Sequence, residues 1–245
     1  MWEEPCISGE KGSGTVFFSG CPLRCVYCQN REIARGEAGK EITPERLAEI
    51  FLELEEKGAA NINLVTPTHY TPEIVWAVEK AGELGLDLPV VYNCSGYEKV
   101  ETLQMLEGIV DIYLTDFKYM EAETAKRYSH APDYPQIGGK AVFDRQGMMK
   151  RGVIVRHLLL PGHLKNAKAV VKYVYETYGN QVYLSLMNKY TPLPGMERWP
   201  ELNRKVTRRE YERLVDFAVD LGVENGFIQE GETAQESFIP AFDGE

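Results

Sequence analysis

Apolar residues recur along the chain with two alternating periods, which predict strands and helices in turn. Short apolar or β-branched runs bounded by Gly, Pro or Asn predict strands. These are residues 14–20, 61–66, 88–93, 110–116, 153–160, 181–187 and 227–228. Apolar positions three and four residues apart predict helices that begin at Thr43, Thr71 and the capping box Thr207–Glu210, and others across 98–106 and 166–178. Residues 119–150 follow neither pattern.

Six or seven strands alternating with helices are typical of an α/β fold with a parallel sheet and right-handed crossovers. The pattern fits an open barrel or a doubly wound sheet. No linker or repeat divides the chain, so residues 1–245 are interpreted as one domain with a lead-in at 1–13 and a tail at 231–245. In either architecture the chemistry belongs at the carboxyl ends of the strands.

Composition narrows the classes of function. The chain is 44% hydrophobic and 26% charged, with a net charge of −10, so it is a globular protein that would repel a nucleic-acid backbone. No signal peptide or membrane-length apolar run is present, so we expect a soluble cytoplasmic protein without a nucleic-acid or membrane partner. A basic spot is either a solvated face or a surface for an anionic partner; it comprises Arg204, Lys205, Arg208 and Arg209.

Three of the five cysteines lie within eight residues, directly after the first predicted strand. Cys21, Cys25 and Cys28 would supply thiolates, which bind iron–sulfur clusters, zinc or copper(I). Three protein ligands leave one metal position open, as in catalytic sites, whereas a structural zinc needs a fourth ligand. The candidates for that fourth ligand are His69, Cys6 and Cys94.

Residues 20–30 (Gly-Cys-Pro-Leu-Arg-Cys-Val-Tyr-Cys-Gln-Asn) resemble the signature of the radical S-adenosylmethionine (radical SAM) enzymes, with Tyr27 before the last cysteine. More narrowly, Phe-Phe-Ser-Gly at 17–20 and Gly-Lys-Glu-Ile-Thr at 39–43 are similar to the pyruvate formate-lyase activating enzymes. Asp-Phe-Lys at 116–118, Val-Arg at 155–156 and Leu-Pro-Gly at 160–162 extend the likeness over most of the chain. The match is to an activating-enzyme-like branch whose substrates are unassigned.

The resemblance implies a partial (β/α)6 barrel with a [4Fe–4S] cluster on Cys21, Cys25 and Cys28, and with SAM on the fourth iron. It implies an oxidoreductase that cleaves SAM reductively to a 5′-deoxyadenosyl radical, with a low-potential flavodoxin or ferredoxin as electron donor. The substrate would be a glycine of a glycyl-radical enzyme, or a small molecule or peptide. A non-catalytic zinc or iron–sulfur scaffold is the rival interpretation.

The resemblance also implies roles at the later strands. Asp116 would help to hold SAM through a monovalent cation, Lys118 by a polar contact, and Arg156 near the SAM carboxylate or ribose. Two alternatives stay open. Asp116 and Lys118 face the same way and can pair with each other, and Arg156 can form a buried salt bridge, because a buried guanidinium needs an anionic partner.

Some positions depart from the family pattern. Thr66 and Thr68 lie where many radical SAM enzymes have Gly-Gly-Glu, and Asn93-Cys94-Ser95 lie where the activating enzymes have Asp-Thr-Asn, so one negative charge is lost. Asn188 is a weaker candidate at the sixth strand. The candidate cofactor-binding residues are Tyr27, Thr66, Thr68, Asn93, Ser95, Asp116, Lys118, Arg156 and Asn188. The roles of Cys6, Cys94 and His69 stay open.

Overall fold

The computed structural model describes residues 3–134 and 151–228; the tail predicted at 231–245 and the end of the region 119–150 lie outside them. Within these ranges, seven parallel strands form one sheet in which each strand pairs with the next along the chain. The strands are β1 Gly14–Phe17, β2 Ile62–Val65, β3 Val90–Cys94, β4 Ile112–Asp116, β5 Gly152–Leu158, β6 Tyr183–Met187 and β7 Gly226–Ile228. Each predicted strand is confirmed, with ends that differ by up to three residues.

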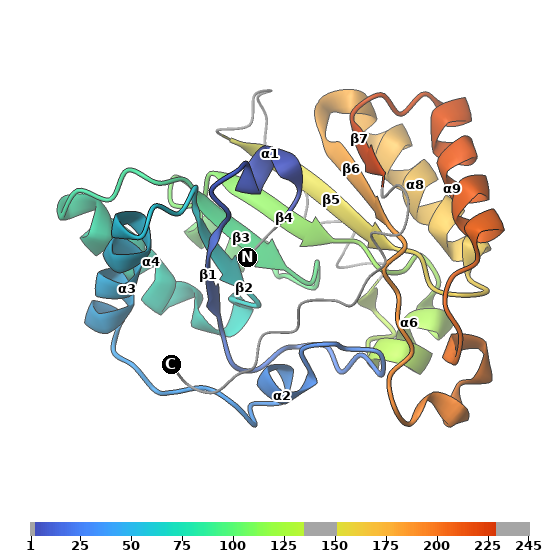
Figure 1. Ribbon diagram of the computed structural model, residues 1–245, viewed down its shortest axis with the longest axis horizontal. Coiled ribbons are helices and arrows are strands. Elements are labelled where there is room, and N and C mark those ends of the chain that lie inside the picture. Colours follow the sequence, from blue (N-terminus) through green and yellow to red (C-terminus); the bar gives the residue numbers. More distant parts are fainter. Residues whose placement is uncertain (1–2, 135–150, 229–245) are drawn as a thin grey trace.

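Helices connect the strands. The α-helices are α1 Pro5–Ser8, α2 Arg31–Ala34, α3 Pro44–Glu56, α4 Thr71–Glu83, α5 Val100–Met105, α6 Ala122–Ser129, α8 Leu164–Tyr178 and α9 Arg208–Leu221. The 3₁₀ segments in the described ranges are η1 Thr68–Tyr70, η2 Gly179–Gln181, η3 Met196–Arg198 and η4 Pro200–Leu202. Figure 1 shows α3 and α4 beside the first strands and α8 and α9 beside the last.

Local capping explains where two of the long helices begin. The Thr43 side chain accepts a hydrogen bond from the Arg46 amide before α3, and Thr207 forms the predicted capping box with Glu210 before α9. Helix α4 begins at Thr71 as predicted, but Thr71 does not cap α4 in the way that Thr43 caps α3. Thr71 is already helical, and its hydroxyl donates to the carbonyl oxygen of Thr68 at 3.2 Å.

The sequential strand order decides between the two architectures that the sequence left open. Right-handed crossovers that always advance in one direction place their helices on one face of the sheet. A doubly wound sheet needs a reversal of direction, and the described strands show none. The sheet is therefore of the partial-barrel type, with a helix-covered outer face and an inner face.

The two faces of the sheet bury different groups. Outward side chains pack on the helices, as Leu64 does on Phe51 of α3. Inward side chains form an apolar layer with Ile7, which the α1 segment places inside the barrel; they are Val91, Ile112, Leu114 and Ile154. Polar residues follow this layer toward the carboxyl ends of the strands, so the barrel interior changes from apolar to polar along its axis.

Candidate active site

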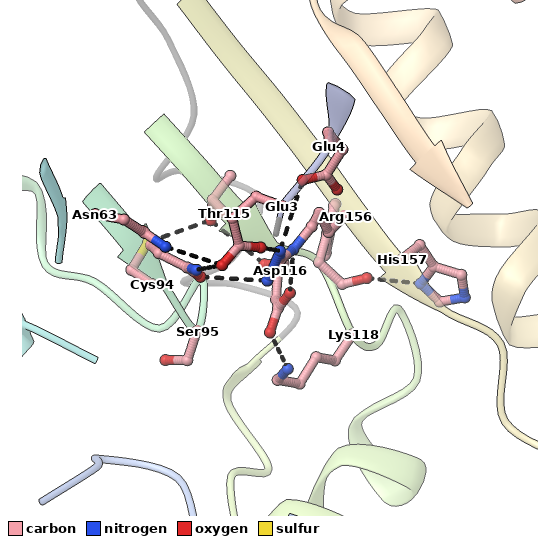
Figure 2. A network of polar contacts seen from close by, with 12 residues as sticks. Glu3, Glu4, Asn63, Cys94, Ser95, Thr115, Asp116, Lys118, Arg156 and His157 are labelled. Atoms are coloured by element: carbon pink, nitrogen blue, oxygen red, sulfur yellow. Dashed lines mark hydrogen bonds and ion pairs between the residues drawn. The ribbon is translucent and has the colours of Figure 1, made fainter. Parts of the chain in front are cut away.

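Asp116 lies at the end of β4 between two positive charges (Figure 2). Its Oδ2 pairs with the Lys118 ammonium, and its Oδ1 lies 3.7 Å from Nε of Arg156 on β5. Burial acts to raise the pKa of Asp116, but the charges of Lys118 and Arg156 outweigh it, so the pKa falls below its usual value. The ion pair that the sequence left open therefore forms. Both carboxylate oxygens of Asp116 face side-chain cations. The monovalent cation expected beside Asp116 therefore stays a prediction.

The N-terminal segment supplies the anionic partner that a buried Arg156 requires. Nη1 of Arg156 donates to Glu3 Oε2 at 2.7 Å and lies 3.7 Å from Glu4 Oε2, while Nη2 donates to Asn93 Oδ1 at 3.3 Å. Glu3 Oε1 accepts a hydrogen bond from Asn63 Nδ2 at 2.8 Å. Arg156 thus forms the buried salt bridge, and its contact with SAM stays a prediction.

Sequence reasoning did not identify Glu3, Glu4 or Asn63 as site residues. A signal was present for Asn63, which alternates with Ile62 and Leu64 in a buried strand and therefore points to the inner face. No such signal marks Glu3, because an acidic residue before a four-residue helix is normally exposed.

Tyr134 connects three backbone positions of the site. Its hydroxyl accepts from the Lys118 amide at 3.0 Å and lies within donating distance of the carbonyl oxygens of Ser95 and Asp116. Gly96 makes this approach possible, because a Cβ there would overlap the Asp116 carbonyl oxygen, and its φ of +72° favours glycine. The loop after β3 is thereby held against the end of β4. Among the described residues, the buried Ser95 Oγ has no hydrogen-bond partner, so it is available to a ligand.

The three clustered cysteines are half-buried in the loop between β1 and α2. Burial is the main cause that raises the pKa of each thiol above its usual value, and the charge of Lys118 opposes it in all three. Lys118 therefore connects this loop electrostatically to Asp116. Three half-buried thiols beside a cation fit a soft metal group, which would displace their protons on binding.

The remaining cysteines do not complete a fourth-ligand set. Cys6 packs against the inner apolar layer, and Cys94 is buried on the outer face with Tyr92 and Leu106. In residues 3–134 and 151–228, no three His, Cys, Asp or Glu side chains converge on a point where one metal ion could bind. The three thiolates of a [4Fe–4S] cluster bind different irons, so they need not converge in this way.

The loop after β2 carries the other predicted SAM contacts. Thr66 adopts a left-handed backbone conformation, with φ of +59°, and the Thr68 hydroxyl donates to Glu98 Oε1 at 2.9 Å. Glu98 is 2% exposed, and burial raises its pKa to about 7. Sequence reasoning missed Glu98. It accepts the hydrogen bond of the Thr68 hydroxyl, which we expected to be free for SAM. His69 is exposed beside Gly20 of the cysteine loop.

Three other expectations meet different outcomes. Tyr27 is buried, and its hydroxyl lies 2.5 Å from that of Tyr119 rather than in the polar network. Asn188 directly follows β6 at the carboxyl edge. Two arginines of the basic spot are neutralised by acidic neighbours, in the pairs Arg204–Glu210 and Arg208–Glu212.

Comparison with known proteins identifies the class. Residues 15–174 match the model of the radical SAM superfamily, which is well over half of the chain. The chain belongs to the radical SAM superfamily, whose members carry a [4Fe–4S] cluster and use SAM. No helix in the described ranges is long and apolar enough to cross a membrane.

The individual proteins that this chain resembles share about a third of its residues or fewer. An uncharacterized protein of Methanocaldococcus jannaschii is 31% identical over 216 residues, which are 84% of this chain and 62% of that protein. A pyruvate formate-lyase-activating enzyme of Staphylococcus aureus is 24% identical over 219 residues, 83% of this chain and 84% of that enzyme. Streptococcus suis SuiB, solved with its precursor peptide SuiA, is 12% identical with a TM-score of 0.57, over 88% of this chain and 48% of that one. The likeness to SuiB supports the fold alone.

Proposed function

We propose that this chain is a radical SAM oxidoreductase whose Cys21, Cys25 and Cys28 hold a [4Fe–4S] cluster. The observation that carries the proposal is the place of these thiols, at the carboxyl edge of β1 and within the electrostatic reach of Lys118. When bound, the cluster and SAM supply a 5′-deoxyadenosyl radical that removes a hydrogen atom from the substrate.

The chain's own residues would bind and orient SAM. We assign Lys118 and Asp116 to its charged methionyl end, because they place opposite charges beside the cysteine loop. Ser95 would donate or accept through its hydroxyl, which has no hydrogen-bond partner in residues 3–134 and 151–228. The other candidates at this edge are Thr66, Thr68, Asn93, Arg156 and Asn188.

We further propose that a low-potential flavodoxin or ferredoxin supplies the electron and that the substrate is a glycine of a partner enzyme. The named relative that supports this substrate class is the Staphylococcus aureus activating enzyme, at 24% identity. A small molecule or peptide is the alternative substrate. Incubation with a glycyl-radical enzyme from the same genome should produce the doublet of a glycyl radical in EPR if the first proposal is correct.

The first experiment is anaerobic reconstitution with iron and sulfide, followed by dithionite and SAM. We expect about four irons per chain and the release of 5′-deoxyadenosine with methionine. Cys25→Ala should lose the cluster, whereas Cys6→Ala, which removes a cysteine outside the loop, should keep it. Stoichiometric zinc without sulfide would instead establish the scaffold interpretation.

A further inference from the structure

The carboxyl end of α6 is bonded to the cysteine loop on both sides of Cys25. The Arg24 amide donates to the carbonyl oxygen of Ser129 at 3.2 Å, and the Val26 amide donates to that of Tyr128 at 2.8 Å. These two backbone hydrogen bonds fix the distance between the loop and the helix. A side chain at this end of α6 therefore has a defined position relative to Cys25.

Ser129 uses that position to contact the sulfur. Its Oγ lies 2.9 Å from Cys25 Sγ and 2.8 Å from the hydroxyl of Tyr119, which in turn lies 2.5 Å from the hydroxyl of Tyr27. Ser129 is 1% exposed and Tyr119 is fully buried. Four side chains from three segments thus form a hydrogen-bonded series whose two hydroxyl–hydroxyl contacts are buried and whose end at Cys25 is partly buried.

If Cys25 bound a metal, the hydrogen bonds in this series of side chains would all point in one direction, toward the sulfur. A thiolate can only accept hydrogen bonds, so the Ser129 hydroxyl must donate to Cys25. The Ser129 oxygen then accepts from Tyr119, and the Tyr119 oxygen accepts from Tyr27. Each hydroxyl donates once toward the sulfur, and hydrogen bonds aligned in this way strengthen one another.

We infer that Ser129 is a positioning residue that donates a hydrogen bond to the Cys25 ligand sulfur and thereby raises the reduction potential of the cluster. Reduction adds negative charge to the cluster and its sulfurs, so a donor at the sulfur stabilises the reduced state more than the oxidised state. Tyr119 and Tyr27 support the donor through the chain. The inference rests on the proposed function, since it requires the cluster on Cys25.

The test is an anaerobic redox titration of the reconstituted protein, in which the EPR signal of the reduced cluster is recorded at each potential. Ser129→Ala should shift the midpoint potential downward, and Tyr119→Phe should shift it in the same direction by less. Ser129→Thr, which keeps the hydroxyl, should retain the wild-type potential. Ser13→Ala is the matched control, because it removes a buried hydroxyl near the amino ends of the strands. It should leave the midpoint potential of the cluster unchanged.

The possible results separate the inference from the proposed function. Unchanged potentials in Ser129→Ala and Tyr119→Phe, with a full complement of iron, would overturn the role of Ser129 and leave the enzyme assignment intact. If Ser129→Ala assembles no cluster, Tyr119→Phe decides, and an unchanged potential there overturns the inference. A wild-type protein that binds no iron would overturn both.

Discussion

Glu98 is buried between the loops that follow β2 and β3. One carboxyl oxygen accepts from Thr68, and within the described part of the chain the other has no hydrogen-bond partner. Burial is the largest influence on its pKa, which rises from 4.5 to about 7. The folded protein therefore holds a proton on Glu98 at pH values where the unfolded chain has released it.

This proton makes stability depend on pH. Between pH 4.5 and about 7 the folded state binds more protons at Glu98 than the unfolded state, so the free energy of unfolding falls as pH rises. Glu98→Gln removes the effect, because its amide has no proton to lose. Relative to wild type, the variant should gain about 2–3 kcal/mol between pH 5 and pH 8.

Urea denaturation of the metal-free proteins at both pH values measures this gain. Glu101→Gln, at an exposed position on α5, serves as the control, and because it keeps Glu98 its stability should follow that of the wild type at both pH values. A difference between Glu98→Gln and wild type that is the same at pH 5 and pH 8 would contradict the raised pKa.

Single residues also show which contacts of the site can be predicted from the sequence and which cannot. Spacing along a strand was enough to predict that Asp116 and Lys118 face the same way, and the structure shows the pairing that the sequence left as an open alternative. Burial of a guanidinium was enough to predict an anionic partner for Arg156, but not that the partner is Glu3, which is 153 positions away. Such a contact depends on the complete fold, and no local pattern encodes it.

At the scale of elements, the segment around α1 acts as part of the barrel interior. Ile7 enters the apolar layer, and Glu3 and Glu4 enter the polar one (Figure 2). The two layers require different residues from the same short segment. The ion pairs with Arg156 and the packing of Ile7 together hold the segment in the barrel.

The network predicts unequal costs for removing its members. Arg156→Gln leaves Glu3, Glu4 and Asp116 without their guanidinium and should lower the free energy of unfolding by about 3–5 kcal/mol. Glu3→Gln should cost about 1–3 kcal/mol, because Arg156 keeps two other carboxylates. Chemical denaturation of the metal-free protein measures both values.

Glu10→Gln, exposed on the same segment, provides the baseline and should stay within about 0.5 kcal/mol of wild type. Equal costs for Arg156→Gln and Glu3→Gln would show that the other carboxylates do not contribute.

Elements also differ in how well the sequence predicts them. Parallel strands buried on both faces give apolar runs, which is why β3 and β5 were located from sequence, whereas β2 was located from the alternation of Asn63 with Ile62 and Leu64. The α6 helix was missed, because Ala-Glu-Thr-Ala-Lys-Arg-Tyr-Ser is short and mostly polar. Ser129 was missed with it, since its relation to Cys25 exists only once α6 contacts the cysteine loop.

For the whole molecule, the cysteine loop and α6 form one unit that a cluster would stabilise. A ligand that binds only the folded state raises stability by mass action. Cluster loading should slow amide hydrogen exchange in residues 20–30 and 122–129 and leave α3 and α9 nearly unchanged. Hydrogen-exchange mass spectrometry of the metal-free and reconstituted proteins tests this.

Cys25→Ala, treated in the same way, should show no added protection in either segment. Protection spread evenly over the sheet would argue against a local unit.

The contact between Glu3 and Arg156 has a consequence for how the chain folds. During synthesis from the amino end, Glu3 lacks its cationic partner Arg156 until β5 has left the ribosome, because 153 positions separate the two residues. Loop closure over such a distance is slow compared with the pairing of neighbouring strands. The strands can therefore associate in order from β1, and the amino-terminal segment can settle into the barrel only near the end. Early folding intermediates would keep this segment accessible to proteases after the first strands are already protected.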